Sequence, residues 1–397
     1  MSLTVLIDLD NTLISNDMDQ FLPAYLEILS SYLPQWPAEK VIHALLAGTR
    51  QMVQKNLPNH TLSETFDQVF YPGLNVEKAQ IQNQIDLFYR EGFPKLKGLT
   101  TSRPEARQLV DYLFSKGHWV MVATNPLFPA TAIQQRLEWA DLPVDRYPFS
   151  IVTSYESFHF CKPNPAYLAE ILATAGWPER PAVVIGDGLE EEIIPAGKLG
   201  LPAFWVTEKS LPLPSGLHPL SDKGPVSAIL PWIRRLESCE TLEIQAASPA
   251  AVSAILKSTP AALDTLTRGL SDQEWHERPT TGAWAMTEII CHLRDVDREV
   301  NLPRFKQVVA GANPFFAGIV TDVWAEERSY IRENGPDAMK AFMDVRTELV
   351  VLLDSLDEAS WRLPARHAIF GPTQLIELAG FITTHDRTHV HQAFETI

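Results

Sequence analysis

In the segment Thr4–Thr12, which reads TVLIDLDNT, a short apolar run leads directly into an acidic pair. The pattern predicts a short buried parallel strand that carries carboxylates at its carboxyl end. Asp8 and Asp10 are two residues apart, so both side chains point to the same side of a regular strand. One carboxylate can attack phosphorus, and the other can carry a proton to the leaving group and from water.

Strand-like and helix-like segments alternate along the first half of the chain. After a helix-periodic insertion over about residues 17–89, the pattern predicts further strands at 118–123, 150–153, 182–185 and 202–206 and helices at 104–115, 130–139 and 165–175. Alternation of this kind predicts an α/β fold with a parallel sheet. Ligands of such folds bind at the carboxyl ends of the strands.

Polar residues follow the other predicted strands. Thr124 and Asn125 come directly after one of them and can donate hydrogen bonds to phosphate oxygens. Lys162, in the sequence CKPNP, supplies a fixed positive charge that offsets the charge of aspartates and phosphate. We therefore predict that these three residues bind a phosphoryl group.

A second acidic segment follows the predicted strand 182–185. Asp187 lies after Gly186 and offers a hard oxygen ligand for Mg²⁺, and Glu191 or Glu192 lies one turn further on to support it. The cation is needed because a carboxylate that attacks a phosphate is repelled by its charge.

Together these segments resemble the haloacid dehalogenase superfamily of hydrolases over about residues 1–235. The family's four motifs stand in order: the segment Asp8–Thr12, then Thr124, Lys162 and Gly186-Asp187. The resemblance implies a Rossmann-like sheet and a mobile helical cap at about 16–92.

The resemblance also implies a role for each motif residue. Asp8 becomes the nucleophile and Asp10 the general acid and base, while Asp8, the Asp10 carbonyl and Asp187 hold the metal. An acid at position 10 favours a phosphatase over a dehalogenase. Glu190-Glu191-Glu192 stands where the family often has a second Asp, and the spacing favours Glu192 as the supporting carboxylate.

The pattern changes after about Leu211. Residues 211–226 are rich in Pro, Ser and Gly, and beyond Ala246 we expect no strands. Helix-like segments at 252–270, 287–311, 339–356 and 373–394 predict a four-helix bundle in residues 247–397. Residues 236–246 are the predicted linker.

Three histidines of the second half are candidates for a transition-metal site. His385 and His389 are four residues apart, so both rings project from one helix face, and His292 on another predicted helix can supply a third ligand. His391 falls roughly on the opposite face and is left out. His218, His276 and His367 are expected at the surface.

The flanks of these histidines resemble the DinB-like (YfiT-like) family of four-helix bundles. The match rests on Gly282-Ala283-Trp284, on His292-Leu293 and on the segment His385–His389 with Gln392. The resemblance implies that the three histidines bind a divalent transition metal such as Zn²⁺ or Ni²⁺. Some members are thiol-dependent transferases or isomerases, and bundles of this type often pair, which leaves a homodimer open.

The formal net charge of −16 argues against nucleic acid or an anionic membrane as a partner. Three cysteines far apart fit a reducing cytoplasm, and no 18-residue apolar stretch is present. The main hypothesis is thus a Mg²⁺-dependent phosphatase that acts on a small phosphomonoester. The alternatives are a phosphomutase, or a metal-dependent thiol transferase or binding module to which the first domain is accessory.

Overall fold

The computed structural model describes residues 1–239, 248–311 and 313–397, which form two compact units. The first comprises Met1–Asn56, His60–Asn164 and the described residues from 179 to 239. The second comprises Leu57–Asn59, Pro165–Pro178 and the described residues from 248 onward. None of the described helices is both long and apolar enough to span a membrane.

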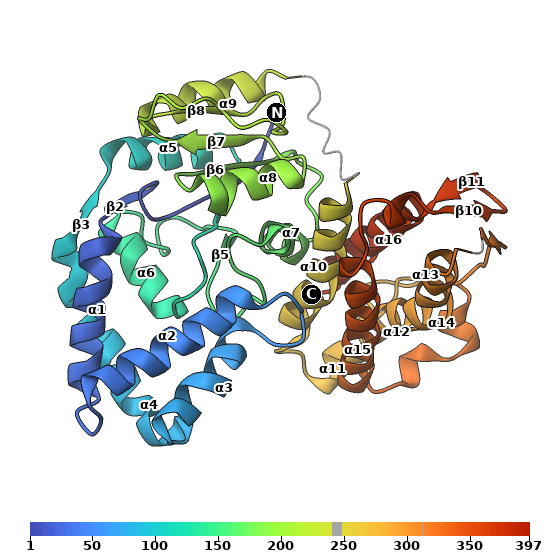
Figure 1. Ribbon diagram of the computed structural model, residues 1–397, viewed down its shortest axis with the longest axis horizontal. Helices are drawn as coiled ribbons and strands as arrows, with labels where there is room; N and C mark the ends of the chain where they lie inside the picture. Colours follow the sequence, from blue (N-terminus) through green and yellow to red (C-terminus); the bar gives the residue numbers. More distant parts are fainter. Residues whose placement is uncertain (240–247, 312) are drawn as a thin grey trace. The chain divides into compact units, whose positions relative to one another are not determined.

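A six-stranded parallel sheet lies at the centre of the first unit (Figure 1). Its strand order is β5-β4-β1-β6-β7-β8, and the bounds are β1 (Thr4–Ile7), β4 (Trp119–Val122), β5 (Ile151–Val152), β6 (Ala182–Gly186), β7 (Ala203–Val206) and β8 (Asp222–Gly224). The residues of β1, β6 and β7 are all buried, as their continuous apolar sequences predict. The α/β fold expected from the sequence is confirmed.

The insertion after β1 is helical. It contains α1 (Met18–Tyr32), α2 (Ala38–Gln54), α3 (Leu62–Leu74) and α4 (Lys78–Leu87), and a capping box between Thr61 and Glu64 begins α3. The insertion is joined to the sheet by two antiparallel strands, β2 (Ile14–Asn16) and β3 (Thr100–Ser102). The remaining helices of this unit are α5 (Pro104–Ser115), α6 (Ala130–Trp139), α8 (Ile194–Lys198) and α9 (Ile229–Glu237).

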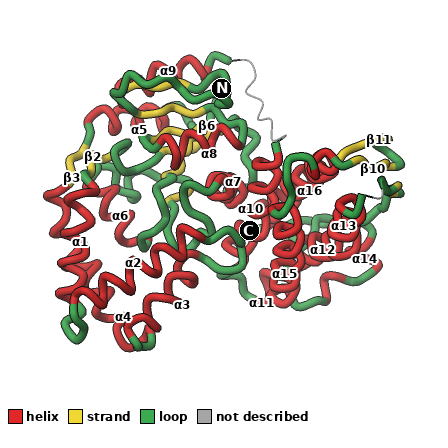
Figure 2. The backbone as a smooth tube through the Cα atoms, viewed as in Figure 1, coloured by secondary structure: helices red, strands yellow, loops and turns green. Residues whose placement is uncertain are grey.

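Helices dominate the second unit, as Figure 2 shows. The four long helical segments are α10 (Pro249–Thr267), α12 (Met286–Val296) continued into α13 (Leu302–Val309), α15 (Gly335–Asp354) and α16 (Leu375–Thr396). A π-helical turn at Asp297–Asn301 joins α12 to α13, and α11 (Asp272–His276) and α14 (Trp324–Glu327) are short. The expected helical bundle is therefore present.

The expectation that strands are absent beyond residue 246 is wrong. A three-stranded sheet of order β11-β10-β9 consists of β9 (Phe315–Phe316), β10 (Pro364–His367) and β11 (Gly371–Gln374). Two of these strands contain or begin with proline and none alternates clearly, so no period-2 signal precedes the pairing. The sheet buries His367, which was expected at the surface.

Helix α7 (Pro165–Thr174) groups with the second unit, where it packs along α10. Eight consecutive residues of α7 are buried, which is typical of a helix that is covered on all sides. The sequence assigned this segment to a first domain of residues 1–235. The second unit is therefore assembled from separate stretches of chain, and most of the predicted linker, from residue 240 on, lies outside the described residues.

Candidate active site and candidate metal centre

The strand order brings three of the predicted site residues to one edge of the sheet. β1 lies between β4 and β6, with Ile7 opposite both Val122 and Ile185. Asp8 follows β1, and its amide donates to the Ile185 carbonyl at 2.9 Å. Thr124 and Asp187 follow the two neighbouring strands, so the carboxyl ends of all three strands supply polar groups to one place.

Lys162 lies at the centre of this cluster. Its Nζ donates to Asp8 Oδ1 at 2.5 Å and to Glu192 Oε1 at 2.7 Å. Lys162, Asp8 and Glu192 are at most 4% exposed. A buried ammonium held between two buried carboxylates is costly to desolvate unless the pairing is close, so this arrangement fixes all three groups in position.

Glu192 can reach Lys162 because two glycines, Gly186 and Gly188, leave space for its carboxylate. A π-helical turn at Leu189–Ile193 turns Glu192 inward, and the Gly188 amide donates to its Oε2 at 2.5 Å. A Cβ at Gly186 or Gly188 would lie 2.6–2.7 Å from that oxygen, so a larger residue at either position would displace the Glu192 carboxylate. Glu191 is exposed, so the geometry favours Glu192, as the spacing did.

The cluster holds more negative than positive charge. Burial, and then the charge of Asp8, raise the pKa of Asp187 to about 6, and burial is also the main cause that raises the pKa of Glu192 to about 7. Lys162 is the cation among these three carboxylates. Carboxylate oxygens are ligands that Mg²⁺ prefers, so a divalent cation held by Asp8 and Asp187 fits both the donor set and the charge.

Asp10 has two partners that the sequence did not indicate. Its Oδ1 accepts from Asn16 Nδ2 at 2.9 Å and from the guanidinium of Arg136 on α6. Arg136 is 1% exposed, and burial lowers its pKa to about 10. Nothing in the local sequence of α6 marks this arginine as part of the site, because its proximity to Asp10 arises only from the tertiary fold.

The other predicted phosphate-binding residues lie beside the cluster. Thr124 is buried, and its carbonyl accepts from the Thr153 hydroxyl at 2.8 Å. Asn125 follows it and is partly buried, so both remain predicted phosphate ligands. A polar cavity of about 610 Å³ opens beside Asp187 and Asn11 and gives a small molecule room next to the carboxylates.

The three predicted histidines of the second unit come together. One ring nitrogen from each of His292, His385 and His389 lies within 4.8 Å of the others, and the Nε2 atoms of His292 and His385 are 3.0 Å apart. Burial lowers the pKa of His292 to about 3 and of His389 to about 4, helped by the neighbouring rings. Neutral imidazoles converging on one point are the donor set of a transition-metal site.

Neighbouring side chains orient the cluster. His389 Nδ1 lies 3.0 Å from Gln392 Oε1, so a proton on Nδ1 leaves Nε2 free to bind a metal. The Trp284 ring stacks on His389 at a centroid distance of 5.5 Å. His391 instead contacts the Gly176 carbonyl through Nδ1 at 2.8 Å, so it stands apart from the cluster as expected.

A buried network of ion pairs includes Asp386, the residue that follows His385 in the sequence. Arg346 on α15 donates to Asp297 Oδ2 at 2.6 Å and to both carboxylate oxygens of Asp386 on α16. All three residues are at most 1% exposed. Because Asp386 directly follows His385, the network fixes the part of α16 that carries the histidines.

Comparisons with known proteins match two separate ranges of the chain to two families. Residues 3–200 match the family model described as haloacid dehalogenase-like hydrolase, and residues 255–393 match that of the DinB superfamily. No curated protein matches the chain.

Several solved structures are similar to parts of it. A 2-haloacid dehalogenase from Pseudomonas syringae is 21% identical at a TM-score of 0.43, covering 59% of this chain and 100% of that one. A haloacid dehalogenase-type phosphatase from Thermococcus onnurineus is 18% identical at a TM-score of 0.39, and the match covers 61% of this chain and 100% of that one. YfiT from Bacillus subtilis is described as having an unusual four-helix bundle topology. It is 16% identical at a TM-score of 0.35, and the match covers 40% of this chain and 89% of that one.

Proposed function

Because residues 3–200 belong to the haloacid dehalogenase-like hydrolases and residues 255–393 to the DinB superfamily, we propose that the first domain is a phosphatase and the second a metal-binding domain. The substrate of the phosphatase is a small phosphomonoester. The observation that carries this proposal is the contact of Lys162 with both Asp8 and Glu192 at the strand ends, beside Asp187.

In the proposed reaction, Asp8 attacks phosphorus and forms an aspartyl-phosphate while the P–O bond to the leaving group breaks. Lys162, Thr124 and Asn125 bind the phosphoryl oxygens. Asp8, the Asp10 carbonyl and Asp187 would hold Mg²⁺, which when bound would supply positive charge to the transferring group. Asp10 gives a proton to the leaving oxygen and then takes one from the water that hydrolyses the aspartyl-phosphate.

Replacing Asp10 with Asn separates the two steps. With p-nitrophenyl phosphate, whose leaving group needs no proton, we expect one burst of nitrophenolate per chain and then a steady rate about 10²–10⁴-fold below the parent rate. Stopped-flow absorbance measures both phases. A steady rate equal to that of the parent protein would contradict the role of Asp10 in activating water.

A phosphomutase uses the same residues but returns the phosphoryl group to another oxygen of the substrate. Asp10 serves either reaction, so product analysis separates them. We expect free phosphate from a panel of phosphorylated metabolites. Isomerised sugar phosphate without release of phosphate would identify a mutase instead.

For the second domain we propose a transition-metal centre at His292, His385 and His389, with Zn²⁺ or Ni²⁺ as the candidates. The convergence of one nitrogen from each ring supports it. Three imidazoles leave coordination positions open, so such a centre can bind a substrate as well as water. Thiol transfer is the activity that the family resemblance suggests for it.

Replacing His389 with Ala is expected to weaken Zn²⁺ binding to this centre by about 100-fold or more, because one of the three ligands is lost. The measurement is the metal content of the full-length protein after loading and dialysis. The full chain is required because α7 is part of the second unit.

His391→Ala is the matched control, since His391 lies on the same helix but outside the cluster. We expect it to keep the metal that His389→Ala loses. Equal metal content in the two variants would argue against the proposed centre.

A further inference from the structure

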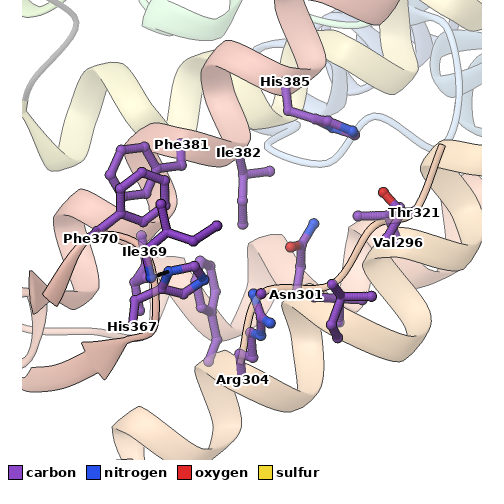
Figure 3. A pocket seen from close by; sticks show the side chains of 15 residues that line it. Val296, Asn301, Arg304, Thr321, His367, Ile369, Phe370, Phe381, Ile382 and His385 are labelled. Carbon is purple, nitrogen blue, oxygen red and sulfur yellow. Dashed lines mark hydrogen bonds between the residues drawn. The ribbon is translucent and has the colours of Figure 1, made fainter. Parts of the chain in front are cut away.

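A pocket of about 290 Å³ lies in the second unit beside His385. An apolar cavity of about 150 Å³ holds one benzene ring, so this pocket has room for a ring with a short side chain. Its walls are mostly apolar, and Phe370 and Phe381 stack at one side with centroids 3.9 Å apart. Figure 3 shows this aromatic pair and, on opposite sides of the pocket, Arg304 and His385.

Several large apolar side chains at the rim of the pocket are exposed to solvent. Ile319, Ile369, Phe370 and Phe381 are between 41% and 72% exposed, and all four line the pocket. A contiguous exposed apolar patch around a cavity is typical of a ligand site. The patch therefore indicates that the ligand has an apolar body.

Arg304 gives this pocket a positive charge, and in the part of the chain that the structure describes no carboxylate forms an ion pair with it. The 15 lining residues include no Asp or Glu, although the whole protein carries a net charge of −16. The guanidinium donates to the neutral Ala317 carbonyl at 2.6 Å and lies over the Phe316 ring. A partly buried arginine that faces an apolar pocket in this way is matched by an anionic ligand.

His367 adds a hydrogen-bond donor to the same pocket. Its Nδ1 accepts from the Ile369 amide at 3.2 Å, so the neutral ring carries its proton on Nε2. Burial, and then the charge of Arg304, lower the pKa of His367, and both residues line this pocket. Together they form a cationic and donor-rich wall, with His385 at the other side.

We propose that this pocket binds a small organic anion with an aromatic or branched apolar body. The carboxylate or similar charge of the ligand pairs with Arg304, the body lies against Phe370 and Phe381, and the far end approaches His385. The approach of the ligand to His385 rests on the proposed metal centre, whereas recognition of the anion by Arg304 does not. The pocket thus places a substrate-sized site of defined chemistry beside His385 of the histidine cluster.

Calorimetric titration of the full-length protein with phenylpropionate and with its neutral amide tests the proposal. We expect the acid to bind and the amide to bind about tenfold or more weakly, the loss expected of a charge-assisted hydrogen bond. Arg304→Met should weaken binding of the acid by a similar factor and leave that of the amide unchanged. Arg304→Lys should retain part of the preference for the acid.

Arg366→Met is the matched control, because Arg366 lies on β10 beside His367 but is exposed and outside the pocket. It removes the same charge and should leave both affinities unchanged. Thermal melting of each variant checks that the fold persists. Equal binding of acid and amide, equal binding of the acid to parent and Arg304→Met, or no binding at millimolar probe would overturn the proposal.

A Co²⁺-loaded sample tests the approach to His385 separately. Phenylpropionate should change the visible absorption of the bound Co²⁺, and this change should be lost in Arg304→Met. A Co²⁺ spectrum that the probe leaves unaltered would reject the approach to the metal. Absence of any Co²⁺ spectrum would instead refute the metal centre while leaving the Arg304 titrations decisive for the pocket.

Discussion

Asp8→Asn is expected to lower turnover of p-nitrophenyl phosphate by roughly a thousandfold or more, the order of loss that follows removal of a catalytic nucleophile. An amide oxygen is a far weaker nucleophile than a carboxylate. The substitution also removes one anionic ligand from the proposed Mg²⁺ site. The side chains are nearly the same size, so the buried packing around Lys162 persists. Release of nitrophenolate with saturating Mg²⁺ measures the effect.

Asp19→Asn provides the control for this experiment. Asp19 lies on α1 close in sequence to Asp8 but is exposed, so the same chemical change there should leave turnover within twofold or so of the parent rate, as surface changes usually do. Mg²⁺-dependent turnover in Asp8→Asn at a rate comparable with this control would exclude Asp8 as the nucleophile.

Arg346→Met is expected to destabilise the second unit by about 3–5 kcal/mol, the loss typical of breaking a buried ion pair by removing one partner. The substitution keeps most of the side-chain volume but leaves Asp297 and Asp386 buried without their cation. Because Asp386 adjoins His385, metal binding should weaken with the fold. Urea unfolding followed by circular dichroism gives the free energy of unfolding.

Lys340→Met on the same helix is the matched control, since Lys340 is exposed. We expect its free energy of unfolding to change by less than about 0.5 kcal/mol. Asp386→Asn should cost less in the Arg346→Met background than in the parent, because the two residues share one network. Additive effects of the two substitutions would contradict a coupled network.

Much of the first unit could be predicted from local sequence because each strand is a short apolar run with a polar residue at its end. A parallel sheet brings such ends together, so the positions of Asp8, Thr124 and Asp187 at one edge follow from the strand order. The histidine cluster was predictable for a similar reason. A four-residue spacing places His385 and His389 on one helix face whatever the rest of the fold does.

The features that escaped prediction depend on contacts between distant parts of the chain. Arg136 resembles any polar residue of an amphipathic helix until α6 packs beside Asp10. The small sheet that buries His367 pairs β9 with β10 across about 50 residues of sequence, and proline weakens its strand signal. One local feature of α7 indicated that it is covered on all sides: its sequence is mostly apolar all round the helix. Nothing local indicated that the second unit covers it.

The most direct test of the central claim is to look for the phosphorylated enzyme itself. In Asp10→Asn, hydrolysis of the intermediate should be slow, so acid quenching during turnover of p-nitrophenyl phosphate should trap it. Peptide mass spectrometry should then find one phosphoryl group on the peptide from the N-terminus through β1, and fragmentation should place it on Asp8. A phosphoryl group on another residue, or a burst of nitrophenolate with no phosphorylated peptide, would contradict the account.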